Sequence, residues 1–395
     1  MPSSRLPDLP NNAPADGPLA GLLVVSIEQA VAAPLASARL AAAGARVIKI
    51  ERSEGDFARG YDSAASGDSS YFTWLNQGKE SAVIDFKDAG GKALLWAMLA
   101  RADVLIQNLS PGALARSGFD NAALQAHNPR LIICNISGYG DSGPASKKPA
   151  YDLLVQAESG LISVSGSPDA LGRIGVSICD IGTGVTAHAG ILEALIKRGI
   201  TKRGSQLSVS LFDVSAEWMM VPYIHAHYGK GAPAPVGLRH PSIAPYGAFE
   251  CGDGRFVLIS IQNEREWQRL CVDALDAPWM AANEAYMSNN ARVANRDALE
   301  AHITKITKGM SAGEFSERLT AARIAFGMVN GAADLQSHPA MRAATYGNSA
   351  ADSLALPAHP ILWDDAEPMP ATKTPKIGEH TDAIIAEFSP AGGDR

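Results

Sequence analysis

The sequence is poor in the residues that build disulfide frameworks and metal sites. Only four cysteines occur among 395 residues, at Cys134, Cys179, Cys251 and Cys271, and no two of them form a CxxC pair. This spacing argues against a disulfide framework and against a zinc ribbon, so we expect reduced cysteines in the core. No HExxH motif and no histidine pair four residues apart occurs. We therefore predict no metal site.

Positive charge and long apolar runs are also scarce. Lys and Arg number 34 against 41 for Asp and Glu, which gives a formal net charge of −7. A mildly acidic chain without a Lys/Arg run offers no charge pattern for nucleic acid or an anionic membrane, so we expect neither as a partner. No uncharged apolar run reaches ~18 residues, and residues 1–17 lack the basic and apolar regions of a signal peptide. The sequence predicts a cytoplasmic protein with a flexible arm at 1–17.

The first half of the chain does contain an alternation of apolar strands and helical stretches. Strands are predicted at 21–27, 47–50, 81–86, 104–107 and 131–136, and helices at 34–43 and 91–101. Strands separated by helices are typical of right-handed βαβ units and a mostly parallel sheet. The chain has no GxGxxG at its first strand-to-helix junction, no GxxxxGK[ST] and no GxSxG. The NAD, P-loop and serine hydrolase interpretations therefore have no motif to support them.

A second domain is predicted beyond a Gly/Pro/Ala-rich connector at 229–237. It begins with a hairpin signal, in which Asp253 and Gly254 separate two apolar runs, and continues with helical stretches at 264–276 and 292–322. We predict a large α/β domain at 18–228, a smaller α+β domain at 229–330 and a C-terminal segment at 331–395.

Asp152 is the acidic residue whose surroundings are most informative. It follows a Gly-rich loop at 137–144 (SGYGDSGP) that comes directly after the predicted strand 131–136, and it precedes an apolar helical run. Open α/β sheets bind ligands at the carboxyl ends of their strands, and glycines permit close approach of the backbone to a ligand. The residue types alone leave two interpretations of Asp152, a helix N-cap and a catalytic carboxylate.

The segment around Asp152 resembles the class III CoA transferases, the formyl-CoA transferase and carnitine CoA transferase family. Similar segments follow one another along almost the whole chain, at 18–21 (PLAG), 44–51 (GARVIKIE), 76–81 (NQGKES), 107–112 (QNLSPG), 151–161 (YDLLVQAESGL), 175–184 and 377–381 (IGEHT). The resemblance implies a Rossmann-like large domain built from both chain ends, a smaller domain, and a homodimer of interlocked chains.

The resemblance also implies that Asp152 is the nucleophile that moves CoA between two carboxylic acids. Its carboxylate would attack the donor thioester to give a mixed anhydride, and the released thiolate would convert this into an aspartyl-CoA thioester. Each tetrahedral intermediate needs hydrogen-bond donors, for which the backbone N–H groups of Gly138 and Gly140 are candidates. Tyr139 either lines the thiol end of the site or packs on the edge of the sheet.

Coenzyme A enters this reaction as a substrate and not as a permanently bound cofactor. Residues implied to contact it are Ala30, Val31, Arg52, Leu75, Lys79, Asn108, Leu109, Ser110 and Arg116. Family members often carry Phe-Arg where this chain has Leu109 and Ser110, so the cation is missing at the second position. The implied partners are an acyl-CoA, small carboxylic acids and a second copy of the chain.

Departures from the formyl-CoA branch point to a different acid. The glycine run that caps the active site of formyl-CoA transferases is missing, and residues 237–242 (GLRHPS) occupy that region. The segments 240–246 and 74–81 look most like members that act on C4 and C5 dicarboxylates, namely mesaconate, itaconate, citramalate and succinate. A second carboxylate needs a cationic or donor partner, and Arg239 and His240 are candidates, although both also suit a solvated loop. Transfer within one molecule of mesaconyl-CoA is a variant of this hypothesis.

Two alternatives share the implied fold. The α-methylacyl-CoA racemases have a histidine directly before the aspartate as a proton carrier, whereas this chain has Tyr151. A tyrosine with a pKa near ~10 is a poor base at neutral pH, which favours the transferase. The second alternative, a non-catalytic CoA-binding protein, requires no acid at position 152.

Overall fold

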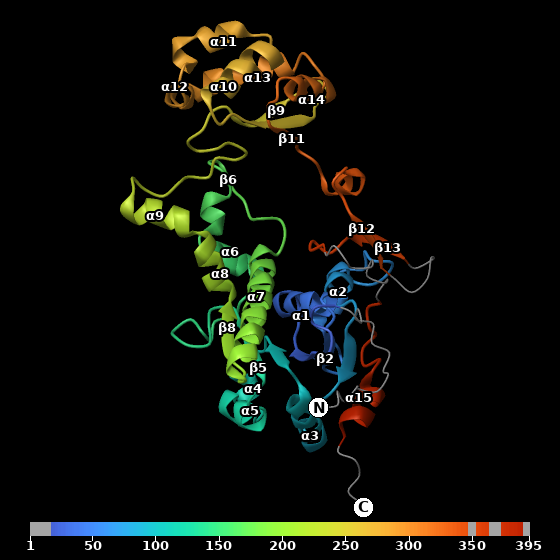
Figure 1. Ribbon diagram of the computed structural model, residues 1–395. Helices are drawn as coiled ribbons and strands as arrows, with labels where there is room; N and C mark the ends of the chain where they lie inside the picture. Colours follow the sequence, from blue (N-terminus) through green and yellow to red (C-terminus); the bar gives the residue numbers. More distant parts are fainter. Residues whose placement is uncertain (1–16, 347–352, 363–372, 390–395) are drawn as a thin grey trace, which may run out of the picture. The chain divides into compact units, whose positions relative to one another are not determined.

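The computed structural model describes residues 17–346, 353–362 and 373–389, which form two compact units (Figure 1). The first unit comprises the described parts of Met1–Leu161, Arg173–Val221 and Arg342–Arg395, and the second comprises Ile162–Gly172 and Pro222–Met341. The domain bounds of 18–228, 229–330 and 331–395 expected from the sequence stay a prediction. Apart from Gly17, the predicted arm at 1–17 lies outside the described residues.

A six-stranded sheet of parallel strands forms the centre of the first unit, with the order β3-β2-β1-β4-β5-β8. The strands are β1 Leu23–Ile27, β2 Arg46–Glu51, β3 Glu80–Val83, β4 Val104–Gln107, β5 Ile132–Ser137 and β8 Gln206–Ser210. Every residue of β1, β2 and β5 is buried, as is typical of a parallel sheet covered on both faces. The predicted α/β fold with a mostly parallel sheet is therefore confirmed.

Helices cover both faces of this sheet. They are α1 Ala32–Ala42, α2 Ser70–Leu75, α3 Ala89–Arg101, α4 Ala113–Arg116, α5 Asn121–His127, α6 Asp152–Glu158, α7 Ile178–Thr201, α8 Leu211–Trp218 and α15 Thr381–Phe388. Successive residues of β1 point to opposite faces, so Val24 belongs to the core beneath α1 and α7 and Val25 to the core beneath α3 and α15. Helices α1 and α7 approach closely at Gly184, where a Cβ atom would lie 2.6 Å from the carbonyl oxygen of Ala32.

The C-terminal segment packs against the edge of the sheet that contains β2 and β3. Arg46 of β2 forms ion pairs with Glu80 at 2.7 Å and with Glu387 of α15 at 2.8 Å. His380 Nδ1, just before α15, accepts a hydrogen bond of 3.2 Å from the Ser81 N–H of β3. Residues from the two ends of the sequence thus complete one unit.

The second unit contains a three-stranded antiparallel sheet of order β11-β10-β9. Its larger elements are β9 Tyr246–Glu250, β10 Phe256–Ser260, β11 Phe326–Met328, α10 Glu264–Arg269, α11 Pro278–Ala282, α12 Asn289–Ala294, α13 Arg296–Thr307 and α14 Ala312–Ala321. The Asp253-Gly254 turn joins β9 to β10, as the sequence predicts. The predicted helix at 264–276 instead changes to a π-helical turn at Leu270–Ala274, and the stretch at 292–322 forms parts of three helices.

Short two-stranded ribbons complete the described structure, formed by β6 Gly166–Ser167 with β7 Ala170–Leu171 and by β12 Ala343–Tyr346 with β13 Leu354–Pro357. All four cysteines are buried and carry free thiols. Among the described residues, every helix is too short or too polar to cross a lipid bilayer. Within the same ranges, no three His, Cys, Asp or Glu side chains gather into a set that could hold a metal ion.

Candidate active site

Asp152 is the first residue of α6, but its carboxylate is bound by the first turn of α7. Oδ1 accepts hydrogen bonds from the backbone N–H groups of Cys179 at 2.7 Å and Asp180 at 3.2 Å. Oδ2 accepts one of 2.7 Å from the side-chain amide of Gln156. The first N–H groups of a helix lack partners within that helix, and an anion satisfies them. Asp152 is therefore not the N-cap of its own helix, because that position belongs to Tyr151.

A second carboxyl group, that of Asp180, lies beside Asp152. Burial and, to a lesser degree, the negative charge of Asp152 together raise the pKa of Asp180 to about 7. Asp180 also acts on the Tyr61 hydroxyl. Burial, together with the charges of Asp56 and Asp180, raises the pKa of Tyr61 to about 12. One carboxylate held by three donors thus stands next to a carboxyl group that is partly protonated at neutral pH.

The Gly-rich loop after β5 packs against the residues that lead into α6. A Cβ atom at Gly138 would collide with the Ala150 side chain, two residues before Asp152, so only glycine fits there. Gly140 has a φ of +89°, and its N–H donates to Ser137 Oγ at 3.0 Å. An oxyanion role for the Gly140 N–H would therefore require that hydrogen bond to break.

Tyr139, in the same loop, packs its ring at the edge of the sheet. The centroid of its ring lies 5.9 Å from that of Phe212 and 5.4 Å from the Lys148 ammonium nitrogen. The ring contact with Phe212 is compatible with packing, and a role of Tyr139 at the thiol end of the site stays a prediction.

The loops that follow β1 and β4 are joined where the strand order reverses. Asn108 Oδ1 accepts from the Gln29 N–H at 3.0 Å, and Asn108 Nδ2 donates to the Gln29 carbonyl at 2.8 Å. Such a switch point is where open α/β sheets bind nucleotides. Ala30, the next residue, has a left-handed backbone with φ of +64°, held by a 3.1 Å hydrogen bond from its N–H to Asp56 Oδ1. The structure thus brings two of the predicted CoA contacts, Ala30 and Asn108, to one place.

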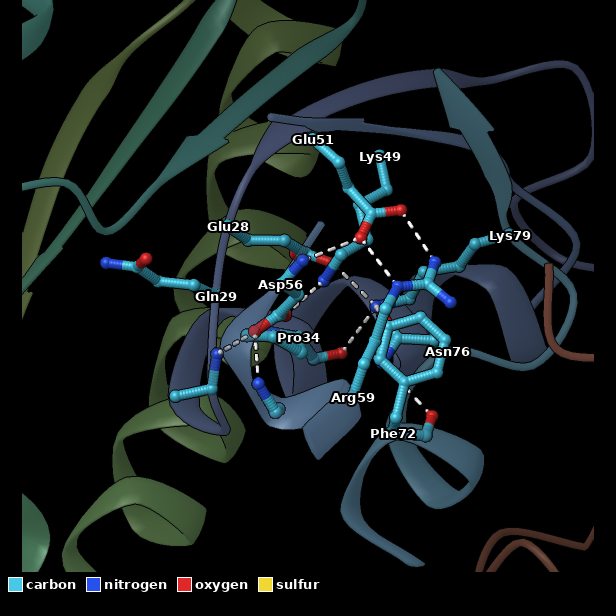
Figure 2. A network of polar contacts seen from close by, with 12 residues as sticks. Glu28, Gln29, Pro34, Lys49, Glu51, Asp56, Arg59, Phe72, Asn76 and Lys79 are labelled. Carbon is cyan, nitrogen blue, oxygen red and sulfur yellow. Dashed lines mark hydrogen bonds and ion pairs between the residues drawn. The ribbon is translucent and has the colours of Figure 1, made fainter. Parts of the chain in front are cut away.

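Behind the Ala30 loop lies a network of buried charged side chains (Figure 2). Lys79 Nζ contacts Glu28 Oε1 at 2.7 Å, the Pro34 carbonyl oxygen at 3.0 Å and Asn76 Oδ1 at 3.2 Å. Lys49 contacts Asp56 at 2.7 Å. All three ammonium protons of Lys79 are thereby engaged.

Burial governs the ionisation of this network. It lowers the pKa of Lys79 to about 8, against the opposing charge of Glu28. Burial alone would raise the pKa of Glu28, but the charges of Lys79 and Lys49 outweigh it and hold that pKa below the usual range. The network therefore contains ionised groups that are shielded from solvent. The charged form of each group is stabilised by the opposite charge of its partner.

The remaining predicted CoA contacts differ in their accessibility. Lys79, Leu75 and Val31 are buried, with exposed fractions of 2%, 0% and 3%. Arg52, Ser110 and Arg116 are exposed. Arg52 follows β2 and the other two follow β4, so all three lie beyond the carboxyl ends of the strands, as Ala30 does. Leu109 is half-buried beside Asn108. The exposed residues are able to touch a ligand directly, whereas Lys79 contacts Glu28, which lies two residues before Ala30.

Arg239 and His240 line a cavity of about 710 Å³ in the second unit. The Arg239 guanidinium forms ion pairs with Asp297 at 3.3 Å and Glu300 at 2.6 Å, both from α13. The His240 ring stacks on Tyr246 with 5.2 Å between centroids. The charge of Arg239 is thus shared with two carboxylates, while one face of His240 is covered by an aromatic ring.

The comparison with known proteins identifies the family. The model of CoA-transferase family III matches residues 19–381. This chain belongs to CoA-transferase family III. It is 35% identical over 379 residues to the acetyl-CoA:oxalate CoA-transferase of Acetobacter aceti, covering 94% of this chain and 96% of the relative. It is 31% identical over 394 residues to a succinate–glutarate CoA-transferase of Agrobacterium fabrum, covering 96% and 97%.

A solved structure of the same family shares the fold. The CAIB/BAIF family protein from Brucella suis superposes with a TM-score of 0.84 at 32% identity, covering 94% of this chain and all of that one. The resemblance noted in the sequence is confirmed, and the protein is a CoA transferase that uses CoA thioesters as substrates. The racemase and the non-catalytic alternatives gain no support from these relatives. Tyr151, at the position of the racemase histidine, is 67% exposed.

Three side chains near Asp152 or its neighbour Asp180 in this CoA transferase were not singled out from the sequence. Gln156 lies four residues along the same helix, a spacing that places two side chains on one face. Asp180 lies within a segment quoted for the family resemblance, but its distance of 28 positions from Asp152 gave no hint of contact. Tyr61 had no sequence signal that we recognise.

Proposed function

We propose that this protein transfers CoA between dicarboxylic acids through covalent intermediates on Asp152. The observation that carries the proposal is the Asp152 carboxylate, which is held by the Cys179 and Asp180 N–H groups and by the Gln156 side chain. The names of the two relatives support the choice of acid, because oxalate and glutarate are both dicarboxylates.

The reaction balances without a net proton or electron. The Asp152 carboxylate attacks the donor thioester carbon, which forms a mixed anhydride and releases the CoA thiolate. The thiolate then attacks the carbonyl carbon of Asp152, forming an aspartyl-CoA thioester and releasing the donor acid. The acceptor carboxylate attacks this thioester to form a second anhydride and release the thiolate. Attack of the thiolate on the acceptor carbonyl forms the new acyl-CoA and restores Asp152.

We assign CoA binding to the carboxyl ends of β1 and β4, where the loops of Ala30 and Asn108 meet. In this assignment Arg52 and Arg116 contact the phosphates of CoA. The joined loops and the exposure of both guanidinium groups support this assignment. Because CoA carries the same phosphates in the ground state and the transition state, Arg116→Ala should raise the KM for acyl-CoA roughly 10-fold and leave kcat unchanged. Steady-state kinetics with varied acyl-CoA measure this.

The matched control for that prediction is Arg203→Ala. Arg203 is also exposed, but it precedes β8 and so lies at the amino ends of the parallel strands, opposite the proposed CoA site. Its replacement should leave both constants unchanged. A fall in kcat at constant KM in Arg116→Ala would reject the assignment of Arg116 to the nucleotide.

We assign recognition of the second carboxylate to the loop that contains Arg239 and His240. Succinate or mesaconate should then be better acceptors than butyrate or crotonate. A charge-assisted hydrogen bond is worth ~1.5–3 kcal/mol, so the preference in kcat/KM should shrink by roughly 10- to 150-fold in the variant that loses it. In Arg239→Ala this decrease should be at the low end of the range, because Asp297 and Glu300 already share the charge of Arg239.

The acceptor assay includes Arg265→Ala as its control. Arg265 is an exposed residue of α10 in the same unit, and its loss should leave the preference intact. A wild-type preference for the monocarboxylates would overturn the dicarboxylate assignment. Full preference in both Arg239→Ala and His240→Ala would overturn the role of this loop.

We also propose that two copies of the chain form the active protein. The helix α9, Met220–Tyr228, is described in full and contains no buried residue, although it carries several large apolar side chains. Met220, Val221, Tyr223 and Ile224 are 47–64% exposed. A second copy of the chain would remove this apolar surface from water. Light scattering should therefore give twice the chain mass of 41.4 kDa, and a monomer mass would refute the proposal.

A further inference from the structure

Gln156 is a buried side chain whose hydrogen bonds all point toward the nucleophile and the segment behind it. It lies one turn after Asp152 on α6, with an exposed fraction of 0%. Its Nε2 atom lies 2.7 Å from Asp152 Oδ2. No other side chain in the part of the chain that the structure describes is recorded as donating to this oxygen.

The orientation of the Gln156 amide is determined by its other contacts. Oε1 accepts a 2.9 Å hydrogen bond from the Ile174 N–H, which is a donor only. The opposite end of the amide, Nε2, must therefore face Asp152, and its second proton faces the Ile174 carbonyl oxygen at 3.3 Å. Residue 174 lies four positions before α7, whose first turn holds Asp152 Oδ1. Gln156 thus joins the nucleophile to the segment that leads into its other binding partner.

The two oxygens of Asp152 are held in different ways. Oδ1 is bound by two backbone N–H groups, those of Cys179 and Asp180, whose positions follow from the helix. Oδ2 is bound by one side-chain amide, whose other proton already faces the Ile174 carbonyl and whose nitrogen also lies 3.5 Å from the Val176 carbonyl oxygen. Oδ2 is therefore the oxygen that is easier to release for attack.

We propose that Gln156 is a positioning residue that aims Asp152 Oδ2 at the thioester carbon while Oδ1 stays on α7. This inference rests on the proposed role of Asp152 as the nucleophile. When Oδ2 bonds to the acyl carbon, the Gln156 amide proton that faced Oδ2 turns to the Val176 carbonyl oxygen, which lies 3.5 Å from Nε2. When the thiolate attacks the Asp152 carbonyl carbon, the negative charge develops on Oδ1, where the Cys179 and Asp180 N–H groups already point.

Gln156→Leu tests this role because it removes the amide and keeps a side chain of similar size. An ill-aimed nucleophile reacts more slowly, so kcat should fall roughly 10- to 100-fold. The KM for acyl-CoA and the dissociation constant for CoA should stay within about twofold of wild type, since Gln156 does not touch CoA in the proposal. An unchanged kcat in Gln156→Leu would overturn the proposal.

Gln156→Glu provides a second readout that a structural role would not produce. The introduced carboxyl donates a proton to Asp152 Oδ2 only when it is protonated, and it repels the nucleophile when it is ionised. The activity of Gln156→Glu relative to wild type should therefore rise as the pH falls from 8 to 5, whereas the relative activity of Gln156→Leu should stay flat. A ratio of Gln156→Glu to wild-type activity that does not change with pH would overturn the positioning role, and this ratio is measurable even where Gln156→Leu fails to fold.

The control for lost hydrogen bonds is Asn128→Leu. Asn128 Nδ2 donates to the carbonyls of Leu99 at 3.0 Å and Ala102 at 2.9 Å, between α3 and the start of β5. Its replacement should lower the unfolding temperature without lowering kcat. Equal losses of kcat in Asn128→Leu and Gln156→Leu would assign Gln156 to stability alone. Failure to trap an acyl group on Asp152 in the wild type would instead refute the proposed function.

Discussion

Asp152→Ala is expected to abolish CoA transfer while acyl-CoA still binds. The replacement removes the atom that forms both the anhydride and the thioester, so no covalent path between donor and acceptor remains. Loss of a nucleophile that acts as part of a unit costs roughly 10⁴-fold or more in kcat. A coupled assay for acyl-CoA formation measures the loss, and calorimetry with CoA measures the retained affinity.

Chemical trapping locates the covalent intermediate in the wild-type enzyme. Hydroxylamine or borohydride added during turnover should modify Asp152 and no other carboxylate. Glu158→Ala is the matched control, because Glu158 ends the same helix, pairs with Lys148 at the surface and should not be needed for transfer. Label on another residue, or transfer by Asp152→Ala within 100-fold of wild type, would refute the assignment.

Lys79→Met is expected to destabilise the folded protein strongly. The change removes the ammonium 2.7 Å from Glu28 and leaves that carboxylate buried, with only Lys49 at 3.6 Å to balance it. Removing one partner of a buried ion pair costs about 3–5 kcal/mol, because the remaining charge has no water to solvate it. Urea unfolding of wild type and variant measures the difference in unfolding free energy.

Two comparisons separate the buried charge from general damage. Arg318→Ala breaks an exposed pair with Glu314 on α14 and should cost at most ~0.5 kcal/mol. Adding Glu28→Gln to Lys79→Met removes the unbalanced charge and should recover part of the loss. A Lys79→Met loss no larger than that of Arg318→Ala would contradict the view that this network stabilises the fold through paired buried charges.

The buried network also supports the Ala30 loop, to which we assign CoA binding. Glu28 lies two residues before Ala30, and Asp56, the partner of Lys49, holds the Ala30 N–H. The left-handed backbone at Ala30 is costly for a residue other than glycine, so it persists only while its surroundings hold it. This is the physical role that the structure offers for Lys79, which the family resemblance implies as a direct contact to CoA.

Local patterns in the sequence were enough for much of the fold. The apolar run at 104–107 predicts a strand whose bounds equal those of β4, and the Asp253-Gly254 turn predicts the hairpin of β9 and β10. Both depend on neighbouring residues alone. The strand β8 was missed, although Leu207 and Val209 alternate with polar residues, because an edge strand of five residues carries a weak hydrophobic signal.

The proposal that Asp152 is the nucleophile came from the sequence, and the contacts of its carboxylate came from the tertiary structure. The motif around Asp152 marks the family, because the order of its residues is unusual whatever the fold. The Asp152 carboxylate binds the first turn of α7 and does not cap α6. This contact joins two residues that lie 27 positions apart in the sequence. Lys79 meets Glu28 across 51 positions, and Arg239 meets α13 across about 60. Periodicity and spacing describe neighbours along the chain, whereas these contacts arise from tertiary packing. Tertiary packing also determines which charged side chains are buried from solvent.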